Sequence, residues 1–167
     1  MLLLPSMAIA GWLNKQGKPM PDSEDRKSKG DFGAHLVLVG DEVELFRRWD
    51  TPGDPVYLNT IDSVKINDFI TAVIIFSGCK ADKNRNCNVT MQFRVVQPDN
   101  KDYYKSPPME VWVNKPATGY SLQLSADYLK TQIEPGEQLG KYIIHALVTD
   151  NNSGTSIDLQ SPFTASK

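Results

Sequence analysis

Residues 69–96 read FITAVIIFSGCKADKNRNCNVTMQFRVV and place two strand-like runs on either side of a short polar loop. The first run, 70–76, is almost continuously apolar, whereas apolar and polar residues alternate over 89–96. Both patterns are typical of β-strands, and the alternation indicates a strand with one buried face. The loop holds both cysteines of the chain, Cys79 and Cys87. The stretch therefore predicts two strands joined as a hairpin.

The position of the two cysteines predicts a disulfide. Strands that meet at such a loop bring Cys79 and Cys87 face to face, and closing so short a loop stabilises a fold by roughly 2–3 kcal/mol. Free thiols are one alternative. A metal pair is the other, but the spacing is too long for a zinc half-site, and only His35 and His145 could complete it. Because disulfides persist in oxidising compartments, we expect a periplasmic or secreted protein.

The N-terminal segment agrees with export. Residues 1–10, MLLLPSMAIA, combine a short apolar run with a small-x-small sequence that is typical of a signal-peptide cleavage site. We interpret them as a signal-peptide remnant, although no Lys or Arg precedes the apolar run. A hydrophobic first strand is the alternative. No stretch of the chain approaches the ~18 consecutive apolar residues of a membrane-spanning helix.

Length and charge narrow the class of protein. A chain of 167 residues suffices for one domain with its own core. The net charge of −2 and the pI of about 5.7 argue against a nucleic-acid-binding protein, which usually has a basic face. Residues 11–33 are mostly polar, and we interpret them as a flexible N-terminal arm. We interpret residues 34–167 as a single β-sandwich domain.

Local patterns predict the elements of this domain. Residues 34–39 are apolar on both faces, which indicates a central strand. Asp41 and Glu44 form a capping-box pattern that predicts a short helix over 42–49, ended by Pro52 and Gly53. Short strand-like runs separated by turn residues follow, and they predict an antiparallel sandwich. These later runs lie at 64–66, 69–76, 89–96, 111–113, 122–133, 141–149 and 157–163.

One segment resembles a known motif. Pro135 to Tyr142, PGEQLGKY, resembles the tyrosine corner of immunoglobulin-like sandwiches, in which a tyrosine at the start of strand F bonds back to the backbone. Residues 62–167 resemble the core of such a domain. Because the cysteines would lie in the loop between strands B and C, the resemblance is to secreted bacterial immunoglobulin-like and fibronectin-like modules. It implies an all-β, antiparallel immunoglobulin-like β-sandwich preceded by one short helix, and it implies no activity.

The disulfide loop also contains a partial metal-site pattern. Asp82, Asn84 and Asn86 form D-x-N-x-N, which begins the calcium loop of an EF-hand. The sixth position of the pattern is Cys87 instead of Gly, and the twelfth is Phe93 instead of Glu. The sequence therefore predicts a turn and no bound metal or other cofactor. A weak calcium site that uses Asp82 and backbone carbonyls stays an alternative.

The candidate interaction surface consists of six residues of types that are common at interfaces or in exposed loops. Trp112 lies between two valines, so it faces outward if the valines face the core, and burial of its ring is the alternative. No G-x-S-x-G motif is present, and His35 and His145 lie in apolar strands, so we predict no catalytic residue. The six residues are Arg47, Arg48, Asp82, Asn84, Asn86 and Trp112.

We therefore expect an exported, non-catalytic binding module whose partner is another envelope or extracellular protein. A glycan is the second candidate partner, and we expect neither nucleic acid nor a membrane span. One alternative is a carbohydrate-binding module, which requires a planar row of exposed Trp and Tyr side chains. The other is a hydrolase with dispersed carboxylates, which requires converging acids of raised pKa in a cleft.

Overall fold

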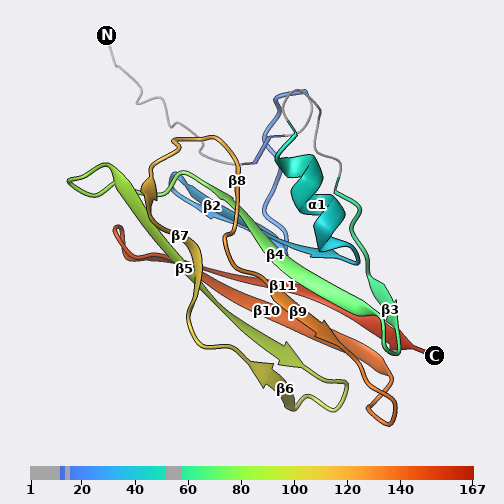
Figure 1. The fold of residues 1–167 in the computed structure, drawn as a ribbon. Coiled ribbons are helices and arrows are strands. Elements are labelled where there is room, and N and C mark those ends of the chain that lie inside the picture. Colours follow the sequence, from blue (N-terminus) through green and yellow to red (C-terminus); the bar gives the residue numbers. More distant parts are fainter. Residues whose placement is uncertain (1–11, 14–15, 52–57) are drawn as a thin grey trace.

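The computed structural model describes residues 12–13, 16–51 and 58–167. It contains two packed β-sheets and one short helix, α1 (Glu42–Trp49), which confirms the predicted all-β sandwich with a helix (Figure 1). The predicted signal-peptide remnant, residues 1–10, lies outside the described residues. The strands are β1 (Arg26–Lys29), β2 (Phe32–Val39), β3 (Ser63–Lys65), β4 (Phe69–Ser77), β5 (Asn86–Val96), β6 (Asp102–Lys105), β7 (Met109–Pro116), β8 (Gln123–Leu124), β9 (Leu129–Gln132), β10 (Gly140–Asp150) and β11 (Thr155–Ser166).

The two strands of the predicted hairpin belong to different sheets, so that prediction is wrong. The first sheet has the order β1-β2-β4-β8, and β9 also pairs with β4. The second sheet has the order β3-β11-β10-β5-β6, and β7 also pairs with β5. The loop after β4 therefore carries the chain from one sheet to the other. Each of the two strands pairs with strands that are distant in sequence, and a local pattern does not record such pairing.

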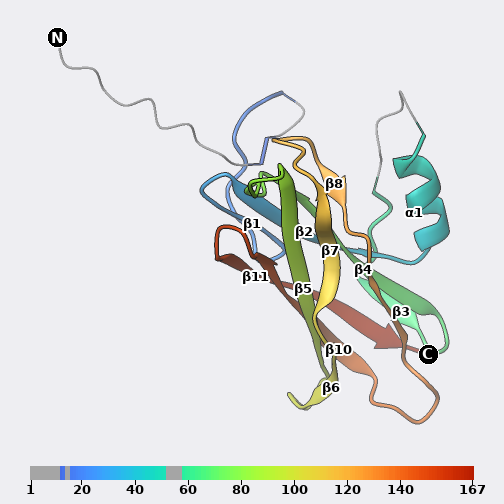
Figure 2. The same ribbon diagram turned by 60° about the vertical axis from the view of Figure 1, so that its left-hand side comes forward.

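Helix α1 explains why the central strands of the first sheet are apolar on both faces. The inward side chains of β2 and β4, such as Leu36 and Ile74, join the core between the sheets. Their outward side chains, such as Val37 and Val73, form a second apolar cluster with Leu45 of α1. The helix thus covers the outer face of the first sheet (Figure 2).

The boundaries of α1 follow from its sequence. The side chain of Asp41 accepts a hydrogen bond from the backbone N–H of Glu44 at 2.9 Å, and the helix covers residues 42–49, as predicted. This bond satisfies one of the N–H groups that lack a partner at the start of a helix.

The polar segment before β2 is partly a strand, which corrects the flexible arm predicted for residues 11–33. Residues 26–29 form β1, which is antiparallel to the first residues of β2. The Nζ atoms of Lys27 and Lys29 donate to the backbone oxygens of Asp158 and Ser156 on β11, at 3.0 and 2.7 Å. The polar side chains of this segment bond to backbone groups at the edge of β11. The sandwich thus begins at β1, and residues 62–167 lack the strand β2 that lies beside β4.

The tyrosine corner is present as the resemblance implied. The hydroxyl of Tyr142, near the start of β10, donates to the backbone oxygen of Gln138 at 2.7 Å. The side chain of Tyr142 is fully buried, and its ring stacks on that of Phe163 at a centroid distance of 5.2 Å. This contact fixes the path of the chain as it enters β10.

Candidate functional site at the disulfide loop

The predicted disulfide is confirmed, and it joins the two sheets. Cys79 follows β4 in the first sheet and Cys87 is the second residue of β5 in the second sheet; their Cα atoms are 5.9 Å apart. Both side chains are buried, with exposed fractions of 7% and 1%. We call residues 79–87 the disulfide loop. The bond fastens one end of the sandwich, where this loop leaves the core.

Asp82 organises the backbone of the disulfide loop. Its Oδ1 atom accepts hydrogen bonds from the backbone N–H groups of Asn84 and Asn86, both at 2.8 Å. Its backbone oxygen accepts from the N–H of Arg85 at 3.0 Å. The D-x-N-x-N pattern therefore forms a turn, as predicted, with the carboxylate directed to its own loop. Within the described ranges, no three His, Cys, Asp or Glu side chains gather as metal ligands.

The turn between β10 and β11 holds the same loop from a second side. Asp150 is buried, and its Oδ2 atom accepts from the backbone N–H of Lys80 at 2.9 Å. The Nδ2 atom of Asn152 donates to the backbone oxygens of Lys80 and Asn86, at 2.8 and 3.0 Å. The sequence predicts this turn but gives no signal that its side chains reach the disulfide loop. These contacts and the disulfide fix the backbone of the loop.

Gly78 places the base of the loop against two other connections. Its N–H donates to the backbone oxygen of Gly119 at 2.8 Å. Its φ is +72°, and a Cβ atom at this position would lie 1.7 Å from the backbone oxygen of Asp31. Only glycine fits such a close approach of two backbones. The loop therefore emerges from a tightly packed base.

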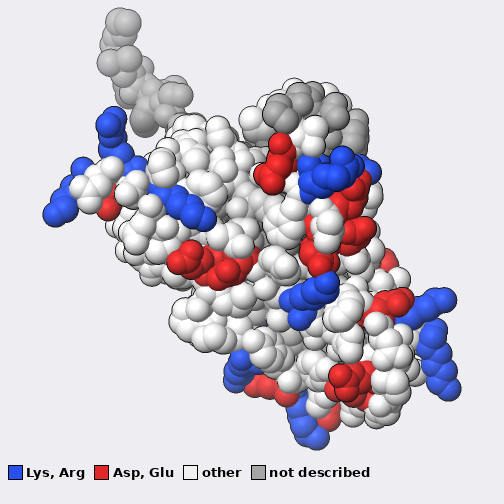
Figure 3. All heavy atoms as spheres, viewed as in Figure 1, with Lys and Arg blue, Asp and Glu red and all other residues white. Residues whose placement is uncertain are grey.

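The side chains of the disulfide loop expose positive charge. Lys80, Lys83 and Arg85 are exposed, and none of them forms an ion pair with a described residue. Lys115 lies opposite Cys87 in the pairing of β7 with β5. Figure 3 shows basic side chains gathered at the end of the molecule where Figure 1 places the loop between β4 and β5. This end therefore presents unpaired cations on a fixed backbone.

Trp112 lies beside this end but is neither fully outward nor fully buried. Its ring is half-buried against Phe76, with a centroid distance of 5.9 Å, and its Nε1 donates to the backbone oxygen of Pro116 at 2.9 Å. The Nζ atom of Lys115 lies 4.8 Å from the centre of the ring. The expected alternation of Val111, Trp112 and Val113 between the two faces of the strand is not strict. The pairing of β5 with β7 shifts register on either side of Asn88 and Val89, which turns the side chains of β7.

The two predicted arginines are not part of this surface. Arg47 and Arg48 lie on α1 and bond to the carboxylate of Glu44 at 2.7 and 2.5 Å. These hydrogen bonds lower the pKa of Glu44 to about 2. Because α1 covers the outer face of the first sheet, the structure does not bring its arginines together with the disulfide loop (Figure 1).

The tryptophans do not form the row that a carbohydrate-binding face requires. Trp12, Trp49 and Trp112 are all half-buried. Trp12 and Trp49 pack against the cluster under α1, whereas Trp112 packs against the core between the sheets. These three side chains therefore lie on different parts of the sandwich and do not share one exposed plane.

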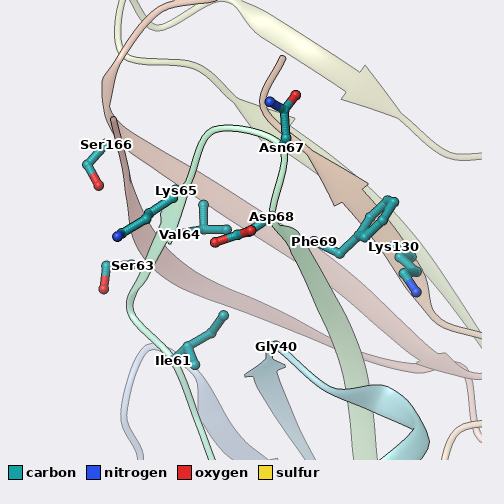
Figure 4. A pocket seen from close by; sticks show the side chains of 10 residues that line it. All are labelled: Gly40, Ile61, Ser63, Val64, Lys65, Asn67, Asp68, Phe69, Lys130 and Ser166. Carbon is teal, nitrogen blue, oxygen red and sulfur yellow. The ribbon is translucent and has the colours of Figure 1, made fainter. Parts of the chain in front are cut away.

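A pocket of about 580 Å³ lies near the opposite end of the sandwich, and it contains none of the predicted site residues. Figure 4 shows Lys65 and Asp68 on one side of it and Phe69 with Lys130 on the other. The Nζ atom of Lys130 lies 4.6 Å from the centre of the Phe69 ring and also pairs with Glu42. No local pattern marks this pocket, because its lining residues come from segments that are distant in the chain.

A second pocket, of about 390 Å³, brings His35 together with Asp25 and Asp62. The Nε2 atom of His35 lies 3.5 Å from Oδ2 of Asp25. Burial lowers the pKa of His35, against the opposing effect of the Asp25 carboxylate. Neither Asp25 nor Asp62 was singled out from the sequence, because two acids that are distant in the chain carry no local pattern.

No protein-family model matches the chain, and no curated protein matches it either. Among solved structures, a Niemann-Pick type C2 protein from the Japanese carpenter ant has a TM-score of 0.42 and 11% identity, over 78% of this chain and 89% of that one. A family 123 glycoside hydrolase from Clostridium perfringens has a TM-score of 0.42 and 11% identity, over 81% and 27%. The DNA glycosylase AlkC from Pseudomonas fluorescens has a TM-score of 0.38 and 9% identity, over 64% and 28%.

The chain thus spans 28% of the AlkC chain and 27% of the glycoside hydrolase chain. At these TM-scores and identities, the likenesses carry no argument about function. In the described part of the chain, no helix has the length and apolar character needed to cross a membrane.

Proposed function

We propose that this protein is an exported, non-catalytic β-sandwich module that binds another macromolecule through the disulfide loop. The observation that carries the proposal is an exposed loop of fixed backbone with three unpaired cations, Lys80, Lys83 and Arg85. A loop that is already ordered loses little conformational entropy on binding. Rigid sandwiches commonly carry their binding residues on such loops.

The disulfide supports export. Bonds of this kind persist in oxidising compartments, and the bond between Cys79 and Cys87 joins the two sheets of the domain. The sequence MLLLPSMAIA at residues 1–10 supports the same location. The proposed location is the periplasm or the extracellular space. An envelope or extracellular protein is the first candidate partner and a glycan is the second; each would contact the same loop.

A binding assay on the native cell surface tests this function without assuming the class of partner. The purified full chain is labelled and titrated onto envelope or extracellular material from the source cells. The loop variant is Lys83→Glu/Arg85→Glu. The matched control is Lys65→Glu/Lys141→Glu, which makes the same change in net charge at two exposed lysines near the opposite end.

We expect saturable binding that weakens by about tenfold or more in the loop variant and stays within about twofold in the control, since removing charges from a contact surface weakens binding more than removing them elsewhere. Thermal unfolding of each variant checks that the fold is intact. Absence of saturable binding, or an equal loss in both variants, would contradict the proposal. Release of cleavage products from the bound material would contradict its non-catalytic part.

A further inference from the structure

The side chains of the disulfide loop narrow the class of partner. The exposed residues of the loop are three cations, the amide of Asn84, the engaged carboxylate of Asp82, and Ala81. The large apolar side chains that are exposed in the described part of the chain all lie outside this loop and outside the turn at residues 151–154. The loop and this turn therefore offer charge and hydrogen-bond donors without an exposed apolar anchor, and the ring of Trp112 beside them is half-buried with Lys115 over it.

This chemistry fits a hydrated polyanion better than it fits a protein or a membrane. Protein interfaces usually bury aromatic or aliphatic anchors at their centre. Peripheral membrane binding usually combines basic residues with apolar side chains that enter the interface. We propose that the disulfide loop binds an acidic polysaccharide, whose carboxylate or sulfate groups contact Lys80, Lys83 and Arg85. This inference rests on the proposed function and names the partner of the same surface.

The backbone of the loop sets the position of Arg85 in particular. Arg85 has a φ of +65°, which is unusual for a residue with a side chain. Its N–H donates to the backbone oxygen of Asp82 at 3.0 Å, and its own backbone oxygen accepts from the N–H of Ala117 at 2.9 Å. Both of its peptide groups are therefore held. A guanidinium placed in this way can form two parallel hydrogen bonds with one carboxylate or sulfate group.

The charge distribution favours an anionic polymer at this end of the molecule. The loop holds three cations and one carboxylate in a chain of net charge −2, so the rest of the chain carries −4. The carboxylate of Asp82 is exposed, but its Oδ1 is engaged by two N–H groups of the loop backbone. A polyanion is thus attracted to the loop end and repelled by the remainder of the surface.

Titration calorimetry of the full chain tests the inference with defined probes. The acidic polysaccharides are heparin, which carries sulfate, and polygalacturonate, which carries carboxylate; dextran is the neutral control. Phosphatidylglycerol vesicles and a DNA duplex represent the other polyanions. We expect binding to heparin or polygalacturonate at about 0.15 M salt that weakens as salt is raised, because screening weakens exposed charge contacts. Dextran should not bind.

Variants distinguish binding at the disulfide loop from nonspecific electrostatic attraction to the whole protein. Lys83→Glu/Arg85→Glu should weaken polysaccharide binding by about tenfold or more, whereas Lys65→Glu/Lys141→Glu should change it by less than about twofold. Cys79→Ser/Cys87→Ser keeps every charge and should still weaken binding by about threefold or more, since the loop loses its preorganisation. An equal effect of the two charge variants would overturn the inference.

Other outcomes would also overturn it. These are no binding to either acidic polysaccharide, or tighter binding to the vesicles or to DNA than to both of them. Protease and polysaccharide-degrading enzymes, applied to the envelope material of the earlier assay, distinguish this failure from failure of the proposed function. If loop-dependent binding is lost after protease and survives removal of polysaccharide, the protein is a binding module but its partner is a protein.

Discussion

The two ends of the sandwich hold their charged side chains in different ways. At the disulfide loop, Lys80, Lys83 and Arg85 form no ion pair with described residues, although the backbone beneath them is fixed. At the other end, which we call the corner end, Lys101 pairs with Asp99 at 2.9 Å and Lys105 pairs with Asp102 at 2.6 Å, although Lys65 and Lys141 near this end form no ion pair with a described residue. Exposed pairs of this kind contribute only about 0–1 kcal/mol. Unpaired cations on a fixed loop remain available to a partner.

Among the substitutions that would distinguish the two ends, Gly78→Ala should cause the largest loss of stability. A Cβ atom would meet the backbone oxygen of Asp31 at 1.7 Å, so the base of the disulfide loop would have to move. We expect a loss of more than about 3 kcal/mol in the free energy of unfolding. Gly154→Ala is the matched control, because Gly154 has the same φ of +72° but no atom within 4 Å of the added Cβ.

The control isolates the steric contact from the conformational cost. Gly154→Ala should lose only about 1–2 kcal/mol, the cost of a left-handed residue with a side chain. Urea unfolding of both variants measures the difference. Equal losses would show that the close approach at the base of the loop contributes nothing.

The next largest effect should come from removing the disulfide. Cys79→Ser/Cys87→Ser opens a short loop, and we expect the free energy of unfolding to fall by roughly 2–3 kcal/mol. Reduction of the unmodified protein should give the same loss in urea unfolding. If both treatments leave stability unchanged, the hydrogen bonds from Asp150 and Asn152 hold the loop end without the covalent bond.

A smaller effect is expected at the corner end. Tyr142→Phe removes a partly buried hydrogen bond of 2.7 Å to the backbone oxygen of Gln138, and we expect a loss of about 1 kcal/mol in the free energy of unfolding. Tyr104→Phe is the control, because Tyr104 is 41% exposed, and it should change stability by less than about 0.5 kcal/mol. Thermal unfolding can compare the two. Binding of heparin should be the same for both variants, since neither tyrosine lies in the disulfide loop.

The smallest change in stability should come from a change of pH. It should not alter the contacts at either end of the sandwich. Burial lowers the pKa of His35, and burial together with Arg94 lowers that of His145. The unfolded chain therefore binds more protons than the folded one below the usual histidine pKa of about 6.5. Stability should be highest above that pH and fall as the pH is lowered through it.

Urea midpoints between about pH 5.5 and 8 measure this change across the usual histidine pKa. His35→Gln/His145→Gln should flatten the curve. A variant that keeps the full pH dependence would show that other groups cause it. Neither histidine lies in the disulfide loop, so binding should follow stability only if the loop itself unfolds.

Short-range patterns predicted the features that depend on neighbouring residues. Asp41 and Glu44 indicated the start of α1, and the structure contains their hydrogen bond. Tyr142 indicated the tyrosine corner in the same way, because the backbone oxygen that its hydroxyl contacts belongs to Gln138, four residues earlier. The cysteine pair could also be predicted from its spacing. In each case the two interacting groups are close in sequence, so a single local conformation brings them together.

Features that depend on distant partners could not be predicted in this way. The polar segment 26–29 becomes a strand because it covers edges of β2 and β11. Asp150 reaches the backbone of Lys80, 70 residues away, and no local pattern marks that contact. The assignment of β4 and β5 to different sheets likewise depends on which strands lie beside them.

The lysines of β1 have a consequence for the behaviour of the protein at high concentration. Lys27 and Lys29 occupy the carbonyl oxygens of Asp158 and Ser156 at an edge of β11, and Pro162 on the same strand has no N–H. A strand from another molecule would have to displace two ammonium groups and would still miss one donor. We therefore expect this edge to resist growth into an intermolecular sheet, which keeps the chain from aggregating through it.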